Sequence, residues 1–253
     1  MNFPSLPTNG KWTLLNTLSA RELTKSFGPR QIVNRVTIEI SSAEIVGLLG
    51  PNGAGKTTTF YMIVGLIRPD AGRILLNDRE ITRLPMHERA RSGISYLPQE
   101  PSVFRRMTVA QNVLAILETL PLREGEKRQR LEELLSDLHI SHLRNQKVVT
   151  LSGGERRRVE ICRSLVLSPA FMLLDEPFSG IDPIAVADIR KIMVSLKEQG
   201  IGILVTDHNV RETLGICDRA YILNEGQIIE EGSPAEIMTS QKAREAHSFM
   251  CAS

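Results

Sequence analysis

Short apolar runs and longer amphipathic segments alternate along this chain of 253 residues. Short runs that are apolar, or that alternate between apolar and polar residues, predict strands, and aliphatic residues that recur every three to four positions predict helices. The predicted strands are 20–26, 32–40, 44–49, 73–76, 94–97, 171–174, 202–206, 219–223 and 227–230, and the predicted helices are 57–65, 109–120, 125–140, 184–196, 210–215 and 234–238. This alternation predicts an α/β fold, with a mostly parallel sheet that helices cover on both faces.

The middle of the chain departs from the alternation. Residues from about 101 to 168 are mainly helical in pattern, and the segment 125–140 is amphipathic. One stripe of that segment holds Leu131, Leu134, Leu135 and Leu138. We therefore predict a helical insertion within one domain that covers 19–240. Residues 1–18 are expected to form a weakly ordered extension, and residues 241–253 a C-terminal tail.

Composition and charge narrow the class of protein. The net charge is +2, with acidic and basic residues interspersed, so a nucleic-acid partner is not expected. The three cysteines, Cys162, Cys217 and Cys251, are far apart, which indicates reduced thiols and not disulfides or metal ligands. No signal peptide is recognisable, and no apolar run approaches the roughly 20 residues that span a bilayer. Any membrane part of the function is therefore expected to come from partners.

A glycine-rich loop follows the predicted strand 44–49 and precedes the predicted helix 57–65. It fits the pattern G-x-x-x-x-G-K-[ST] with Gly50, Pro51, Asn52, Gly53, Ala54, Gly55, Lys56, Thr57 and Thr58. The glycines let successive backbone N–H groups surround an anion, and the helix N-terminus adds positive potential. Lys56 is expected to reach the β- and γ-phosphates of a nucleotide, and Thr57 to bind Mg²⁺. The alternative is a tight turn without a ligand, but a turn alone explains neither the lysine nor the hydroxyl.

Two carboxylates end the apolar strand 171–174. Open α/β sheets bind their ligands at the carboxyl ends of the strands, where Asp175 and Glu176 stand. Asp175 is suited to hold Mg²⁺ through water, and Glu176 to polarise the water that attacks a phosphate. The competing interpretation is an acidic helix cap, which the phosphate loop upstream makes the weaker of the two.

A second glycine motif opens another predicted helix. Leu151 is followed by Ser152, Gly153, Gly154 and Glu155, and the serine and glutamate have the spacing of a capping box. Tandem glycines are not needed for capping, but they leave the helix N–H groups open to an anion. Three arginines follow, Arg156, Arg157 and Arg158, at the helix end where the dipole disfavours cations. They indicate either an anionic partner nearby or a solvated basic face.

Three further polar residues lie at element boundaries. Gln99 follows the strand 94–97, Asp182 precedes Pro183 at a helix start, and His208 follows the strand 202–206. Gln99 is suited to sense metal or water through its amide, and His208 to donate a hydrogen bond to a γ-phosphate. Each alone is more often structural or simply exposed, so their order along the chain carries the argument.

That order resembles the ATP-binding cassette ATPases over roughly residues 19–240. The resemblance implies a P-loop NTPase (RecA-like) core with a mostly parallel sheet, an antiparallel β subdomain and an α-helical signature subdomain. It also implies a homodimer in which residues 152–154 of one copy close over the ATP that Lys56 of the other copy holds. Glu155 and Asp182 are assigned to the same nucleotide site.

The resemblance also implies roles for single residues. Glu176 corresponds to the catalytic carboxylate, Gln99 to the coupling glutamine that also reaches Mg²⁺, and His208 to the switch histidine. Phe27 matches the aromatic residue that stacks on adenine, and it keeps the stacking face of the tyrosine that many relatives carry.

Among the subfamilies, the chain resembles the ATPases of lipopolysaccharide-export transporters of Gram-negative bacteria. The stretches that carry this likeness are 50–61, 96–106, 151–161 and 206–214. By this resemblance, Phe104, Arg105 and Arg106 receive two transmembrane permease subunits at the cytoplasmic face of the inner membrane. A solvated loop is the alternative for these three residues.

Two other functions compete with export. One is the ATPase of a branched-chain amino-acid importer, which association with a periplasmic binding protein would favour. The other is a soluble cassette protein that acts on ribosomes or DNA. Such proteins usually carry two cassettes or a long coiled-coil insertion, whereas this sequence contains one phosphate loop and one LSGGE motif.

Overall fold

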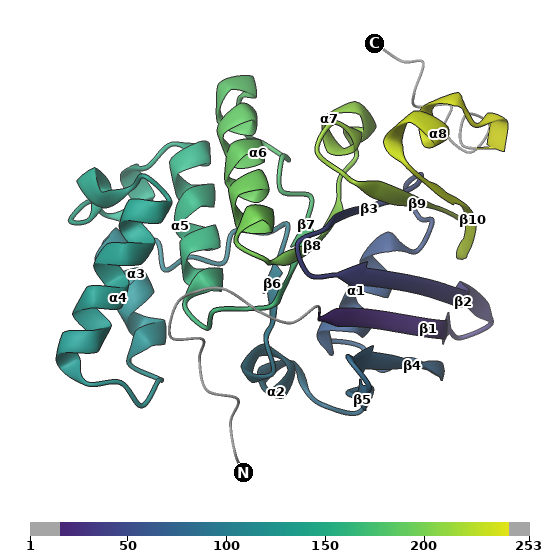
Figure 1. Cartoon of the computed structure of the whole chain (residues 1–253), viewed down its shortest axis with the longest axis horizontal. Coiled ribbons are helices and arrows are strands. Elements are labelled where there is room, and N and C mark those ends of the chain that lie inside the picture. The colour runs from purple at the N-terminus through teal and green to yellow at the C-terminus, as the bar shows by residue number, and fades with distance from the viewer. Residues whose placement is uncertain (1–15, 243–253) are drawn as a thin grey trace.

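The computed structural model describes residues 16–242, and these fold into two sheets with helices around them (Figure 1). The six-stranded core sheet has the order β10-β9-β3-β8-β7-β6. Its strands are β3 (Ile45–Leu49), β6 (Ile94–Leu97), β7 (Phe171–Asp175), β8 (Gly202–Thr206), β9 (Arg219–Asn224) and β10 (Gln227–Gly232). All neighbours are parallel except β10, which runs antiparallel to β9. The predicted mostly parallel sheet is confirmed, and the carboxyl ends of β3, β6, β7 and β8 meet at one edge.

A smaller antiparallel sheet has the order β2-β1-β4-β5. It consists of β1 (Thr17–Phe27), β2 (Arg30–Ser41), β4 (Ala71–Leu76) and β5 (Arg79–Glu80). Val36, Ile38 and Ile40 of β2 are buried alternately with exposed residues, as the sequence pattern predicts. β1 begins at Thr17, two residues before the predicted domain boundary, and Leu18 is 1% exposed in the core; residues 1–15 of the predicted extension lie outside the described residues.

Helices surround the core sheet. They are α1 (Lys56–Val64), α2 (Met86–Arg91), α3 (Val109–Leu117), α4 (Glu124–Asp137), α5 (Gly153–Leu165), α6 (Pro183–Glu198), α7 (Val210–Leu214) and α8 (Pro234–Thr239), with 3₁₀ turns at Ser141–Leu143 and Val148–Thr150. Helices α3, α4 and α5 lie together at one end of the molecule, and α6 lies next to α5 (Figure 1). The sequence pattern missed α2 and β5, which are too short to show periodicity.

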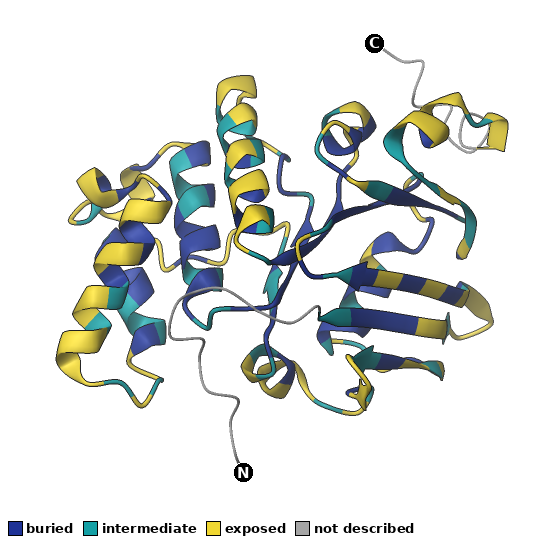
Figure 2. Cartoon of the chain, in the orientation of Figure 1, coloured by how far each residue is buried: buried dark blue, intermediate teal, exposed yellow. Residues whose placement is uncertain are grey.

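Alternate residues of the core strands face two different hydrophobic layers. Met172 and Leu174 of β7 pack with α3 to α6, whereas Phe171 and Leu173 pack with α1 and the antiparallel sheet. The central strands β3, β7 and β8 are fully buried between these layers, whereas β10 at the edge of the sheet is partly exposed (Figure 2). The second face is therefore covered by a helix and a sheet, and not by helices alone.

The predicted leucine stripe of α4 is confirmed. Leu131, Leu134, Leu135 and Leu138 are all buried against α3 and α5. The helix ends earlier than the predicted residue 140, since Leu138 closes it and His139 takes a positive φ of 55°.

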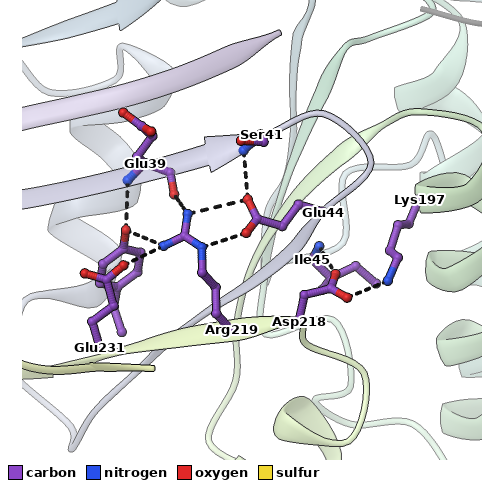
Figure 3. Close-up of polar contacts among 9 residues, drawn as sticks. Glu39, Ser41, Glu44, Ile45, Lys197, Asp218, Arg219 and Glu231 are labelled. Carbon is purple, nitrogen blue, oxygen red and sulfur yellow. Dashed lines mark hydrogen bonds and ion pairs between the residues drawn. The ribbon is translucent and has the colours of Figure 1, made fainter. Parts of the chain in front are cut away.

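One arginine joins the two sheets at the amino end of β9 (Figure 3). Arg219 donates from Nε to Glu44 Oε1 over 2.6 Å and from Nη1 to Glu231 Oε1 over 2.9 Å, and Nη2 donates to the Glu39 carbonyl. Glu39 belongs to β2 and Glu231 to β10, so a single guanidinium connects the antiparallel sheet to the core sheet. Next to it, Asp218 bonds Lys197 of α6 over 2.6 Å. These contacts lie at the edge of the sheet opposite the phosphate loop.

Candidate functional site

The glycine-rich loop connects the carboxyl end of β3 to α1. Gly50 is required there, since a Cβ on it would lie 2.0 Å from the Leu223 carbonyl oxygen of β9. Helix α1 begins at Lys56 and is capped after Val64 by Gly65, which takes the left-handed conformation. The Lys56 ammonium donates to the carbonyls of Gly50 over 2.7 Å and Pro51 over 3.0 Å. Lys56 is buried, and burial lowers its pKa despite the nearby carboxylates.

A cavity of about 250 Å³ opens beside this loop. Its lining includes the predicted residues Asn52, Gly53, Gly55, Lys56, Thr57, Thr58 and Glu176. An adjoining cavity of about 580 Å³ is lined by Pro51, Asn52, Gly53 and Ala54. Arg30 and Ile32 of β2 also line both cavities, and neither is among the predicted site residues. Only the position of Arg30 could have been predicted from the sequence, because it starts the strand that follows the turn at Gly28 and Pro29.

Asp175 ends β7 in a buried position, with 3% exposure. Burial raises the pKa of its carboxyl, and the Tyr96 hydroxyl donates to its Oδ2 over 3.3 Å. Tyr96 lies on the neighbouring strand β6, and burial followed by the Asp175 charge raises the pKa of the phenol. Tyr96 therefore stays a proton donor at neutral pH. Tyr96 is not among the predicted site residues, because a tyrosine within a strand has the pattern of ordinary core.

Glu176 follows directly and brings the three predicted catalytic residues together. Gln99 Nε2 donates to Glu176 Oε2 over 2.8 Å, and His208 Nδ1 lies 3.5 Å from the same oxygen. The backbone of Glu176 has φ of 46°, a left-handed conformation that costs free energy in a residue with a Cβ. Its N–H donates to the Thr206 carbonyl over 2.7 Å, which holds this conformation in place. His208 Nδ1 is also 3.3 Å from Asp207 Oδ1.

The LSGGE motif forms the N-terminus of α5. The Ser152 hydroxyl accepts from the Glu155 N–H over 3.2 Å, and Glu155 Oε2 accepts from the Ser152 N–H over 2.9 Å. The predicted capping box is confirmed. Helix packing requires glycine at position 154, because a Cβ there would lie 2.4 Å from the Ala185 Cβ of α6. Within residues 16–242 of one chain, none of residues 152–155 lines the two cavities at the phosphate loop.

Neither expectation for the three arginines of α5 holds for all of them. Arg157 points inward and is buried at 6% exposure. Arg156 donates to the Leu151 carbonyl over 3.2 Å, and Arg158 lies 3.8 Å from Asp188 of α6. The three side chains thus have separate partners and do not form one basic face.

Two other predicted nucleotide-binding residues lie at element ends. Phe27 ends β1 with a half-exposed ring, and the Lys25 ammonium is 5.6 Å from the ring centroid. Asp182 caps α6, where its Oδ1 accepts from the Ala185 N–H over 3.0 Å. Neither residue lines the two cavities within the described part of the chain.

Phe104 lies on a half-exposed surface before α3. Its backbone N–H donates to Asn112 Oδ1 over 2.8 Å, and the Arg163 guanidinium stacks 4.9 Å from the ring centroid. Met107 and Val149 are exposed as well, and the Val149 N–H bonds the Arg105 carbonyl over 3.0 Å. Phe104, Met107 and Val149 are the exposed apolar residues of this surface, and the Met107 N–H donates to the Phe104 carbonyl over 3.0 Å.

This fold carries a phosphate loop, two strand-end carboxylates and an LSGGE helix. Together these features define an ATP-binding cassette ATPase. The sequence profile of the ABC transporter family matches residues 33–179, and the chain belongs to this family. It is 60% identical to the lipopolysaccharide export system ATP-binding protein LptB of Acidithiobacillus ferridurans, over 91% of this chain and 95% of that protein. It is 52% identical to LptB of Escherichia coli K12, over 91% and 96%.

Solved cassettes have the same fold. The ADP conformation of MJ1267, an ATP-binding cassette of an ABC transporter, superposes with a TM-score of 0.83 at 30% identity and covers 91% of this chain and 98% of its own. The dimeric post-hydrolysis state of the cassette MJ0796 with ADP and Pi gives 0.75 at 25% identity, over 86% and 98%. Between residues 16 and 242, no helix is long and apolar enough to cross a membrane.

Proposed function

We propose that this protein is the ATP-hydrolysing subunit of a transporter that exports lipopolysaccharide. The observation that carries the ATPase mechanism is the convergence of Gln99 and His208 on one carboxylate oxygen of Glu176, next to the cavity that contains Lys56. The names of the LptB relatives, at 52–60% identity over nearly the whole chain, support the cargo.

In the proposed mechanism, Lys56 and the backbone N–H groups of residues 50–58 hold the phosphates of ATP. Glu176 accepts a hydrogen bond from the attacking water and orients it in line with the leaving group. Gln99 and His208 keep the carboxylate in place, and His208, 3.5 Å from Glu176, would donate a hydrogen bond to the γ-phosphate. Phe27 stacks on adenine from the end of β1.

Oxygen donors near the cavity fit Mg²⁺. Asp175 is a buried carboxylate whose pKa is raised by burial and whose side-chain partner Tyr96 is neutral, so a dication would compensate its charge. We assign the Thr57 hydroxyl, the Gln99 amide oxygen and Asp175, through water, to this ion. When bound, Mg²⁺ would neutralise charge on the β- and γ-phosphate oxygens.

A second copy of the chain completes the site in this proposal. Residues 152–155 do not line the cavities of their own chain, and the Ser152 N-terminus of α5 is suited to an anion. These residues and Asp182 would therefore act on the ATP of the partner copy. The similarity to a cassette solved as a dimer supports this arrangement.

Two permease subunits are proposed to dock at Phe104, Arg105 and Arg106. A half-exposed aromatic ring beside two arginines is a surface rich in the residue types that dominate protein interfaces. The proposed ATPase domain comprises residues 19–240, with its helical part at about 101–168. Docking at Phe104 would hold this domain on the cytoplasmic face of the inner membrane.

Copurification with the membrane subunits tests the proposal against its alternative. We expect two permease subunits and ATP-dependent release of lipopolysaccharide from reconstituted membranes. Recovery of a periplasmic binding protein and ATP-dependent uptake of branched-chain amino acids would contradict the export function. Either result would leave the assignment as an ATPase intact.

A further inference from the structure

Arg157 of α5 is a buried arginine that the proposed hydrolysis steps do not use. Burying a guanidinium is costly unless its N–H groups find acceptors, so the acceptors indicate what the side chain does. Nη1 donates to the Pro98 carbonyl over 3.0 Å, and Nη2 donates to the carbonyls of Asp175 over 3.3 Å and Glu176 over 3.4 Å. The guanidinium therefore joins Pro98, which follows β6 and precedes Gln99, to the end of β7.

Glu160, one turn further along α5, extends this connection. It is 3% exposed, and its Oε2 accepts from Arg157 Nη1 over 2.9 Å. Its other oxygen, Oε1, accepts from the Ser102 N–H over 3.1 Å. Arg157 and Glu160 thus hold the segment 98–102, which carries Gln99, at both of its ends.

We propose that Arg157 is a positioning residue, which sets where Glu176 stands relative to Gln99 and so sets the rate of hydrolysis after ATP has bound. The 2.8 Å contact between Gln99 and Glu176 depends on the spacing of the two strand ends. A planar, bidentate guanidinium fixes that spacing, whereas a lysine ammonium cannot bridge both strands in the same way. In the described part of the chain Arg157 does not line either nucleotide cavity. The inference rests on the proposed ATPase function.

The experiment compares Arg157→Gln with Arg158→Gln in the full-length protein. Both variants remove one positive charge from α5 at adjacent positions, but Arg158 faces Asp188 and not the strand ends. We expect Arg157→Gln to lower kcat for ATP hydrolysis about tenfold or more and to change KM for ATP by less than about threefold. Arg158→Gln should retain kcat within about twofold. Equal kcat values for the two variants, or a loss that falls on KM alone, would overturn the proposal.

A conservative variant and a double variant separate positioning from folding. Arg157→Lys keeps the buried charge and should restore part of kcat, and it replaces Arg157→Gln if circular dichroism shows that the latter does not fold. Wild-type kcat in Arg157→Lys would then reject the role of the guanidinium.

The double variant tests whether Arg157 and Gln99 act on the same group. Combined with Gln99→Ala, Arg157→Gln should lower kcat by less than the product of the single effects, because both act through Glu176. Full additivity would also argue against the proposal.

Failure of the inference differs from failure of the proposed function. If the wild-type protein does not hydrolyse ATP, the proposed function is wrong. If the wild type is active and Arg157→Gln behaves like Arg158→Gln, only the role of Arg157 is wrong.

Discussion

Glu176 combines a strained backbone with three polar neighbours, and this combination places its carboxylate. A residue with a Cβ at φ of 46° persists only where the surroundings hold it, as the bond to the Thr206 carbonyl does here. Gln99 and His208 then approach a single oxygen of the side chain. The arrangement leaves a carboxylate beside the cavity, with its orientation fixed before ATP binds.

Replacing Glu176 by glutamine should separate binding from hydrolysis. We expect Glu176→Gln to bind ATP with wild-type affinity and to release phosphate about 100-fold more slowly or worse, because an amide is a poor proton acceptor. Phosphate release and the binding of a fluorescent ATP analogue measure the two properties. Glu22→Gln is the control, since Glu22 also has a positive φ but lies on the antiparallel sheet. Normal turnover in Glu176→Gln would remove this residue from the mechanism.

At the scale of elements, the close approach of α5 and α6 explains one of the two glycines of the LSGGE motif. A Cβ on Gly154 would meet Ala185 Cβ at 2.4 Å, whereas a Cβ on Gly153 would meet Ile181 Cγ2 at 3.3 Å. Gly154 therefore serves helix packing, and the ligand role that we propose for the motif falls to Gly153.

Two alanine variants distinguish these roles. Gly154→Ala should lower the free energy of unfolding by about 1–3 kcal/mol, because α5 and α6 must separate to admit the methyl group. Gly153→Ala should change it by less than about 1 kcal/mol and should weaken the ATP-dependent dimer. Urea unfolding and gel filtration with ATP measure these effects. Equal destabilisation by both substitutions would contradict the assignment.

The Arg219 contacts tie the two sheets together across elements distant in sequence. Arg219→Ala should lower the free energy of unfolding by about 2 kcal/mol, since Glu44, Glu231 and the Glu39 carbonyl lose their shared, partly buried donor. The control is Lys191→Ala, which removes an ion pair from a lysine that is 80% exposed. That variant should stay within about 0.5 kcal/mol of the wild type. Urea unfolding provides both values.

At the scale of the whole molecule, the phosphate-loop cavity and the Phe104 surface belong to different parts of one fold. Phe104→Ala should leave the ATPase activity of the isolated protein within about twofold, because the ring does not line the nucleotide cavities in the described residues. It should reduce copurification with the membrane subunits about tenfold or more, as expected for a central aromatic residue of an interface. Val194→Ala, on the exposed face of α6, is the control. Normal assembly of Phe104→Ala would reject the docking site.

The short strands and the long amphipathic helices could be predicted from the sequence, because their periodicity is a local property of the chain. The leucine stripe of α4 and the fully buried strands β3, β7 and β8 follow from that pattern. The start of β1 at Thr17, the short helix α2 and the covering of one sheet face by a second sheet could not be predicted. They depend on pairing and packing between segments far apart in sequence.

The sequence by itself determined the chemistry of this protein, since a phosphate loop, a pair of strand-end carboxylates and a capped LSGGE helix are each encoded within a few consecutive residues. Only the tertiary structure decided which side chains meet. It brought Gln99 and His208 to Glu176 and added Arg30 and Tyr96 to the site. It also turned Arg157 inward, to the ends of β6 and β7. The physical reason is that parallel strands place residues some 30 to 80 positions apart at one edge of a sheet, an arrangement that depends on strand order and not on local pattern.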